Sequence, residues 1–165
     1  MKGPRVRIPT PGQNAKRAVF GALNARTGQL HYAVQTRKLA VHFMAFLEQL
    51  AQAYPTGEVV LVLDNVITHD AKVVRCWLAQ HPRFRVLWLP KYSAHEHNPI
   101  ERLWGLLKDR VAANRLHGSI DALVTAAEHF FADLGYPAPH PAPAAPAATA
   151  PTCLMASADT IPRAA

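Results

Sequence analysis

The run Val59-Val60-Leu61-Val62-Leu63, closed by Asp64, decides the fold of this chain. Five aliphatic residues without a polar break are typical of a strand that is covered on both faces of its sheet. Such strands belong to α/β sheets, in which crossover helices cover the faces. Ligands of these sheets gather beyond the carboxyl ends of the strands, so Asp64 is expected at a functional edge.

Two strands and a helix are predicted before this run. Residues 18–23 and 30–35 alternate as the strands of a hairpin, and Gly28 suits a turn that needs a positive φ. Thr36 is predicted to cap a helix that Pro55 and Gly57 end. Six apolar residues share one face of that helix: Leu39, Phe43, Phe46, Leu47, Leu50 and Tyr54.

The order after the run is helix, strand, helix, helix. Asp70 is the expected cap of the first helix, and residues 85–89 form a strand that Pro90 stops. Pro99 with Asn98 as cap starts the next helix, and residues 120–134 form the last one. The three tryptophans fall in apolar stripes and are predicted to be core residues: Trp77, Trp88 and Trp104.

The composition divides the chain at residue 134. Residues 1–134 contain enough apolar sequence for one globular domain. Beyond them, seven of the 14 prolines fall between Pro137 and Pro162, interleaved with alanines. Such a segment has little to bury, so residues 135–165 are predicted to be an extended Pro/Ala-rich tail outside the domain.

Charge and cysteine usage indicate a cytoplasmic protein with a polyanionic partner. The first 47 residues carry eight Lys or Arg and no Asp or Glu. Clustered cations suit DNA phosphates, although a solvated basic surface explains the excess equally well. No apolar stretch reaches the ~20 residues of a membrane span. Cys76 and Cys153 are far apart in sequence, as expected of free thiols in a reducing compartment.

Asp64 and Glu101 are the candidate metal-binding residues. The 36 residues between them fit one helix, one strand and a loop, which return the chain to the same sheet edge. Two carboxylates that meet there repel each other unless a divalent cation such as Mg²⁺ lies between them. Each residue has a simpler alternative: Asp64 caps the following loop, and Glu101 forms a capping box with Asn98.

Several neighbouring residues are candidates for supporting roles. Asn65 is placed to orient the Asp64 carboxylate or a ligand, and His69 to contact a phosphate or assist proton transfer. His95 and His97 offer a weaker zinc hypothesis, because their spacing is loose and partners are few. The candidate DNA-binding residues are Arg5, Arg7, Lys16, Arg17, Lys91 and Lys108; for Lys108, a solvated helix position is the simpler interpretation.

Three segments together resemble a known family. They are Val62-Leu63-Asp64-Asn65-Val66-Ile67-Thr68-His69, Leu87-Trp88-Leu89-Pro90-Lys91-Tyr92-Ser93 and Asn98-Pro99-Ile100-Glu101-Arg102-Leu103-Trp104. In this order they resemble the DDE-type transposases of bacterial insertion sequences, in the mariner-related six-thirty group, also described as DDE superfamily endonucleases. The resemblance extends from about Val6 to Leu134.

The resemblance implies a ribonuclease-H-like fold and metal-dependent chemistry on double-stranded DNA. Family members hold two Mg²⁺ or Mn²⁺ ions with three carboxylates, cleave DNA at transposon ends and join these ends to target DNA. By position, Asp64 would be the second of these acids and Glu101 the third, with His69 and Asn98 in supporting motif positions. A homodimer and association with the bacterial nucleoid are further expectations from the family.

The chain departs from the family pattern at its start. The family's first Asp lies on a strand that precedes residues 18–23, and Met1 comes after that strand. We therefore expect a sheet that lacks its first strand and exposes an edge there. A catalytically inactive DNA-binding or dimerising remnant remains the alternative function. Another ribonuclease-H-like nuclease, such as a resolvase, is a third possibility.

Overall fold

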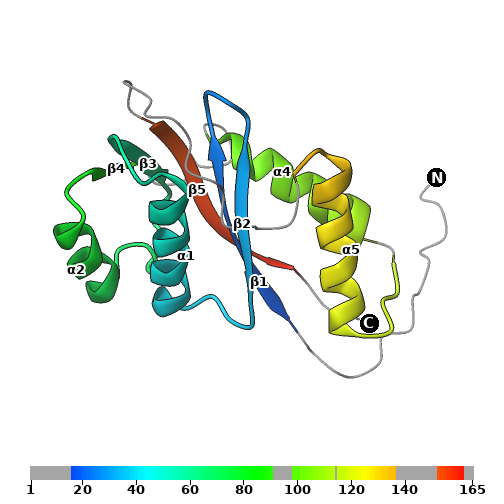
Figure 1. Ribbon diagram of the computed structural model, residues 1–165. Helices are drawn as coiled ribbons and strands as arrows, with labels where there is room; N and C mark the ends of the chain where they lie inside the picture. The colour runs from blue at the N-terminus through cyan, green and yellow to red at the C-terminus, as the bar shows by residue number, and fades with distance from the viewer. Residues whose placement is uncertain (1–15, 91–97, 114, 137–151, 162–165) are drawn as a thin grey trace.

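The computed structural model describes residues 16–90, 98–113 and 115–136 in full, and residues 152–161 by their backbone. The chain forms β-strands, α-helices and one π-helical turn, which Figure 1 shows in their arrangement. Their bounds are β1 (Arg17–Asn24), β2 (Leu30–Gln35), α1 (Ala40–Ala53), β3 (Val59–Leu63), α2 (Lys72–Gln80), β4 (Phe84–Trp88), α4 (Pro99–Leu107), η1 (Lys108–Ala112), α5 (Ile120–Asp133) and β5 (Thr152–Ile161).

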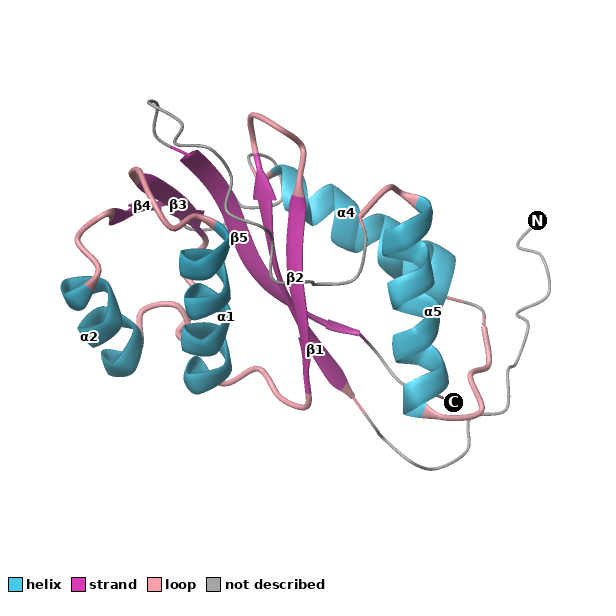
Figure 2. Cartoon of the chain, viewed as in Figure 1, coloured by secondary structure: helices cyan, strands magenta, loops and turns pink. Residues whose placement is uncertain are grey.

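The strands form one mixed sheet in the order β2-β1-β5-β3-β4 (Figure 2). β1 is antiparallel to both β2 and β5, whereas β3 is parallel to both β5 and β4. The predicted α/β class is therefore confirmed. In Figure 1, α1 and α2 lie toward one side of the strands, and α4 and α5 toward the other.

The predicted hairpin is present, and its turn has a clear chemical cause. Asn24 ends β1, and its Oδ1 accepts hydrogen bonds from the backbone N–H groups of Arg26 (2.9 Å) and Thr27 (3.2 Å). Gly28 then takes a positive φ of 73°, a conformation that costs glycine little. These contacts fix the register that pairs Leu23 with Leu30.

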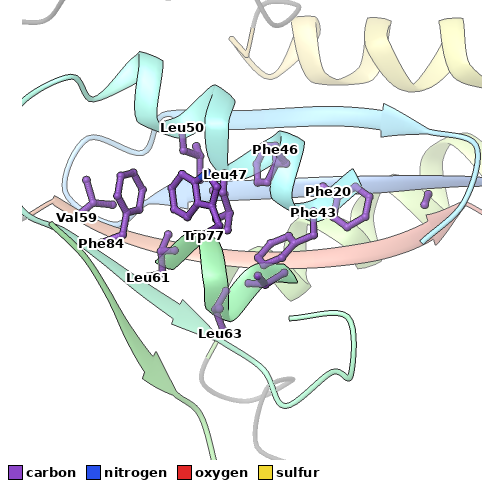
Figure 3. Close-up of a cluster of buried hydrophobic side chains, with 13 residues drawn as sticks. Phe20, Phe43, Phe46, Leu47, Leu50, Val59, Leu61, Leu63, Trp77 and Phe84 are labelled. Atoms are coloured by element: carbon purple, nitrogen blue, oxygen red, sulfur yellow. The ribbon is translucent and has the colours of Figure 1, made fainter. Parts of the chain in front are cut away.

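The first hydrophobic core fills the space between α1, α2 and one sheet face (Figure 3). Alternate residues of β1 and β3 point into it, with Phe20 from β1 and Leu61 and Leu63 from β3. The predicted apolar face of α1 packs on these residues through Phe43, Phe46, Leu47 and Leu50. The continuous aliphatic run of β3 is thus explained, because β3 lies inside the sheet and four of its five residues are buried.

The second core lies between α4, α5 and the opposite sheet face. Val19 of β1 and Tyr32 of β2 meet Ile100 and Trp104 of α4 and Phe131 of α5 there. β1 and α4 approach closely at Gly21, where a Cβ atom would lie 2.5 Å from Cη2 of Trp104. Glycine is therefore required at this position of β1, and the contact fixes where α4 rests on the sheet.

Two expected helix starts were wrong. α1 begins at Ala40 with Leu39 as N-cap, because residues 36–39 form a bend in which Leu39 N–H binds the Arg37 carbonyl (3.1 Å). α2 begins at Lys72 with Ala71 as N-cap. Asp70 closes the preceding turn and pairs with Arg75 at 3.7 Å instead of capping the helix.

The expectation for Trp88 was also wrong. Trp77 and Trp104 are buried as predicted, but Trp88 is 42% exposed. It lies at the end of β4, which is an edge strand with β3 as its one neighbour among the described strands. An edge strand is covered incompletely, so its last residue remains accessible to solvent.

The largest correction concerns residues 135–165. The sequence predicted a tail outside the domain, but residues 152–161 form β5 in the centre of the sheet, between β1 and β3. Each of these ten residues pairs with a residue of β1 or β3 in the sheet. The composition of the segment did not indicate this pairing. The expected exposed edge on β1 is likewise absent from the described sheet, because β1 has a neighbour on each side.

Candidate active site

Asp64 lies just beyond the carboxyl end of β3, as the sequence predicted. Its side chain is 18% exposed, so most of the carboxylate is shielded from water. The expected neighbour His69 returns to it through a turn in which His69 N–H binds the Val66 carbonyl (2.9 Å). His69 Nδ1 lies 2.8 Å from Asp64 Oδ1 and 3.3 Å from the Asp64 carbonyl oxygen.

His69 is held firmly in its orientation. Its side chain is completely buried, and its ring centroid is 4.3 Å from that of Phe43 on α1. Nδ1 faces two oxygens of Asp64, whereas Nε2 has no hydrogen-bond partner among the described residues. The tautomer with hydrogen on Nδ1 fits this environment, because it places the N–H group toward the acceptors.

The Asp64 carboxylate is mostly shielded from water but not closed off by the protein. The buried Oδ1 has the 2.8 Å contact with His69 Nδ1 described above, and the solvent-facing side of the carboxylate is open to a further ligand. A shielded carboxylate with few polar neighbours is unfavourable unless a cation compensates its charge. Carboxylate oxygens are the ligands that Mg²⁺ prefers, so Asp64 fits one side of a divalent metal site.

Asn65, which was expected to orient the Asp64 carboxylate or a ligand, makes a contact within the fold. Its Nδ2 donates to the Leu89 carbonyl, which ties the residue after β3 to the residue after β4. Asn65 and Trp88 also line a shallow surface hollow together with Ile67, which is 89% exposed. The residues that follow Asp64 in the sequence thus form part of an exposed apolar surface, which borders the end of β4.

Glu101 and Asn98 occupy the start of α4, as predicted. Asn98 is the N-cap and its Oδ1 accepts from Ile100 N–H (3.3 Å), while Pro99 takes the first helical position. Glu101 falls in the first turn, where the helix dipole stabilises a negative charge. Asn98 is 2% exposed, and its Nδ2 has no hydrogen-bond partner among the described residues.

The fold positions α4 beside the strands that lead to Asp64. α4 packs on β1 and β5, and β5 is the direct neighbour of β3. Within the described side chains, no three His, Cys, Asp or Glu residues come together as a metal-binding group. Asp64 and Glu101 are therefore candidate ligands whose set lacks a third described member.

The predicted DNA-binding residues divide into two groups. Lys16 and Lys108 are exposed, and Arg17 on β1 lies 3.6 Å from Asp121 of α5. Arg5, Arg7 and Lys91 lie outside the described residues, as do His95 and His97 of the zinc hypothesis. No helix in the described ranges has the length and apolar character to cross a membrane.

A second polar cluster, which the sequence did not indicate, joins the hairpin to α1. The Tyr54 hydroxyl lies 3.1 Å from Asn24 Nδ2 and 3.0 Å from His31 Nε2. Burial lowers the pKa of His31 and raises the pKa of Tyr54, while the hydrogen bond from Asn24 lowers the latter. This cluster joins the end of α1 to β1 and β2.

Comparisons with known proteins identify the family of this chain. The sequence profile of the DDE superfamily endonucleases matches residues 1–124. An insertion element IS630 protein of 39 kDa from Shigella sonnei is 34% identical over 131 residues, which are 79% of this chain and 38% of that protein. The chain therefore spans well under half the length of this relative.

Two solved structures are similar to this chain. A chain of the simian T-cell lymphotropic virus intasome is 14% identical, with a TM-score of 0.50 over 66% of this chain and 40% of that chain. The catalytic core domain of BIV integrase is 21% identical, with a TM-score of 0.49 over 73% of this chain and 81% of that one. The fold is thus ribonuclease-H-like, as predicted, and the chain belongs to the DDE superfamily endonucleases, related to the proteins of insertion element IS630.

Proposed function

We propose that this protein cleaves phosphodiester bonds of DNA and transfers strands at transposon ends, with divalent metal ions held by Asp64 and Glu101. The observation that carries the proposal is the Asp64 carboxylate, which lies at the end of β3, is 18% exposed and is held by buried His69 at 2.8 Å. Membership of the DDE superfamily endonucleases supports the same chemistry. Mg²⁺ or Mn²⁺ bound there would supply Lewis acidity for attack on a phosphodiester.

The side chains around Asp64 have distinct positioning roles. His69 fixes the carboxylate through the 2.8 Å contact and is itself held against Phe43. Asn98 fixes the first turn of α4 and thereby the position of Glu101. Such supporting contacts determine how well a metal site is preorganised before its ligand arrives.

Double-stranded DNA is the proposed partner, as transposon end and as target. The first 47 residues carry eight basic and no acidic side chains, which suits contacts with the phosphate backbone. Exposed Lys16 and Lys108 are candidates for such contacts. A homodimer and a cytoplasmic, nucleoid-associated location also belong to this proposal and follow from the family.

The test is nicking of supercoiled plasmid in Mn²⁺ by the wild type, Asp64→Asn and Glu101→Gln. Both substitutions remove a charged oxygen with little change of shape, so each should abolish nicking. Asp133→Asn, at an exposed position near the end of α5, is the matched control and should nick like the wild type. Nicking that persists in both active-site variants contradicts the proposal.

A second candidate function is DNA binding without cleavage. The absence of a third metal ligand among the described side chains favours this alternative. It predicts DNA binding that falls steeply with salt and remains unchanged in Asp64→Asn, because phosphate contacts then carry the affinity. Binding measured by fluorescence anisotropy, together with the nicking assay, separates the two functions.

A further inference from the structure

β5 is the central strand of the sheet and the last described element of the chain. It separates two half-sheets, one formed by β1 with β2 and the other by β3 with β4 (Figure 1). β1 and β3 therefore turn one backbone edge each toward the position of β5. These two edges, residues 17–24 and 59–63, form the walls of a strand slot that takes one strand.

Helix α1 connects the two walls of the strand slot. The Phe43 ring of α1 contacts Phe20 on β1, with ring centroids 6.0 Å apart, and His69 after β3, with ring centroids 4.3 Å apart. Leu61 and Leu63 of β3 belong to the same core as these two phenylalanines (Figure 3). One helix thus packs against both walls, so the walls belong to one chain whichever chain supplies the strand between them.

The strand slot binds its strand through backbone pairing. Every residue of β5 has a partner on β1 or β3, and residues 154–156 have a partner on each side. Main-chain pairing of this kind provides affinity for any chain that offers the same strand. A second copy of this chain offers an identical one, and a mutual exchange preserves all pairings of both sheets.

The connection to β5 is long and rich in proline. Residues 137–151 join Tyr136 to β5 and contain six prolines and seven alanines. A segment of that length can span up to about 50 Å, whereas a domain of this size has a radius of gyration of about 14 Å. Pro-rich sequences act as semi-rigid spacers, which lowers the effective concentration of a strand at the slot of its own chain. The connection therefore suits a strand that reaches a neighbouring molecule.

We propose that β5 is exchanged between two copies of this chain, so that residues 152–161 of each copy fill the strand slot of the other. This inference rests on the homodimer of the proposed function, to which it gives an interface, and not on the metal chemistry. Ala156 pairs with Leu63, the residue before Asp64. The strand beside each candidate metal site thus comes from the second copy, and each site is supported by both chains.

Two variants of the full chain with one cysteine each test the exchange. The donor, Cys76→Ser, keeps Cys153 on β5. The acceptor combines Cys76→Ser and Cys153→Ser with Val60→Cys, on the β3 residue that pairs with position 153. Neighbouring strands are about 4.8 Å apart, a separation that suits a disulfide. Neither variant can form this disulfide within one chain.

Donor and acceptor are unfolded together, refolded at high protein concentration and oxidised. We expect a disulfide-linked heterodimer on a non-reducing gel, which a mass tag on the donor distinguishes from homodimers. The matched control acceptor carries Arg85→Cys in place of Val60→Cys. Arg85 is the β4 partner of Val60, one strand further from β5 at about twice the distance, and should give no heterodimer. A heterodimer with both acceptors, with neither, or with the control alone overturns the proposal.

A single chain with both partners shows which copy supplies the strand. With Val60→Cys and native Cys153 in a Cys76→Ser background, exchange predicts a covalent dimer after refolding at high concentration. Dilution before oxidation should replace it by a disulfide-linked monomer, because association depends on concentration. A linked monomer at every concentration refutes the exchange and leaves the metal chemistry of the proposed function untouched. A covalent dimer whose wild-type parent nicks no DNA refutes that chemistry and leaves the exchange standing.

Circular dichroism of each variant controls for folding. Val60→Cys removes little volume from a half-buried position, so its spectrum should equal that of the wild type. A variant with the wild-type spectrum that forms no disulfide in either the mixture or the single chain would contradict the pairing of β3 with β5. That result would also overturn the exchange, which depends on this pairing.

Discussion

His69 Nδ1 lies 2.8 Å from Asp64 Oδ1, and the two residues differ sharply in burial: the histidine is fully enclosed, whereas the aspartate opens to solvent at the end of β3. The buried partner is held against Phe43 by ring contact. The orientation of the carboxylate is thus determined from inside the first core, before any ligand binds.

His69→Gln should reduce the nicking rate in Mn²⁺ by about ten- to a hundredfold, the usual effect of removing a residue that orients a metal ligand. It should also weaken Mn²⁺ binding, which a purely structural role would leave unchanged. The matched control is His129→Gln at an exposed position of α5, for which both quantities should equal those of the wild type. Equal Mn²⁺ affinity in His69→Gln and wild type would refute the positioning role.

Gly21→Ala should destabilise the fold by about 1–3 kcal/mol, the typical effect of overpacking a core. The new Cβ would approach Trp104 Cη2 at 2.5 Å and would displace α4 from the sheet. Gly105→Ala is the contrasting variant, because no described atom beyond the backbone of its own helix and its chain neighbours lies within 4 Å of the added Cβ. In the interior of α4 it should stabilise by up to about 1 kcal/mol. Urea unfolding followed by circular dichroism measures both, and equal stability of the two variants would contradict the packing argument.

The stability of the protein should decrease on acidification below pH 6.5, partly because of His31. Burial lowers the pKa of His31 from its ordinary value of 6.5. The unfolded chain therefore binds this proton more readily, so the contribution of His31 is complete above pH 6.5 and is lost as the pH falls toward the folded pKa. His31→Gln should flatten the dependence of Tm on pH between about 7 and 5. His129→Gln should keep the wild-type slope, and an unchanged slope in His31→Gln would contradict the assignment.

Arg83→Ala should cost about 1.5–3 kcal/mol of stability, because a charged group donates two hydrogen bonds. The guanidinium donates to the Tyr54 carbonyl and, at 3.0 Å, to the Ala51 carbonyl, and thereby satisfies acceptors at the end of α1. Arg85→Ala removes an exposed ion pair with Glu58 and should cost at most about 1 kcal/mol. Thermal unfolding measures the stability of both variants. A larger loss of stability in Arg85→Ala than in Arg83→Ala would refute this interpretation.

The parts of the fold that the sequence predicted correctly have local causes. The hairpin follows from Asn24 and Gly28, whose turn chemistry depends on neighbouring backbone groups. The start of α4 follows from Asn98 and Pro99 in the same way. The expected nearness of His69 to Asp64 needed only a short turn after β3.

The parts that sequence analysis missed depend on distant partners. β5 pairs with β1 and β3, which lie more than 80 residues earlier, and its own residues mix small, polar and apolar types. The preference of a residue for a β-strand depends more on the surrounding sheet than on the segment itself. The sequence analysis had no knowledge of that sheet and therefore followed the many prolines nearby, which predict an extended tail. Trp88 was misassigned for a related reason, because its exposure depends on β4 being an edge strand. The metal-binding roles of Asp64 and Glu101 remain predictions.

The position of β5 has a consequence for how the protein folds during synthesis. β1 to β4 and the helices leave the ribosome before the strand that joins them, so a nascent chain holds two half-sheets with β1 and β3 each open on one side. Pairing across such a separation is slow, and unpaired strand edges invite association with other chains. Sheet closure must therefore follow translation of residues 152–161, and aggregation competes with folding until then.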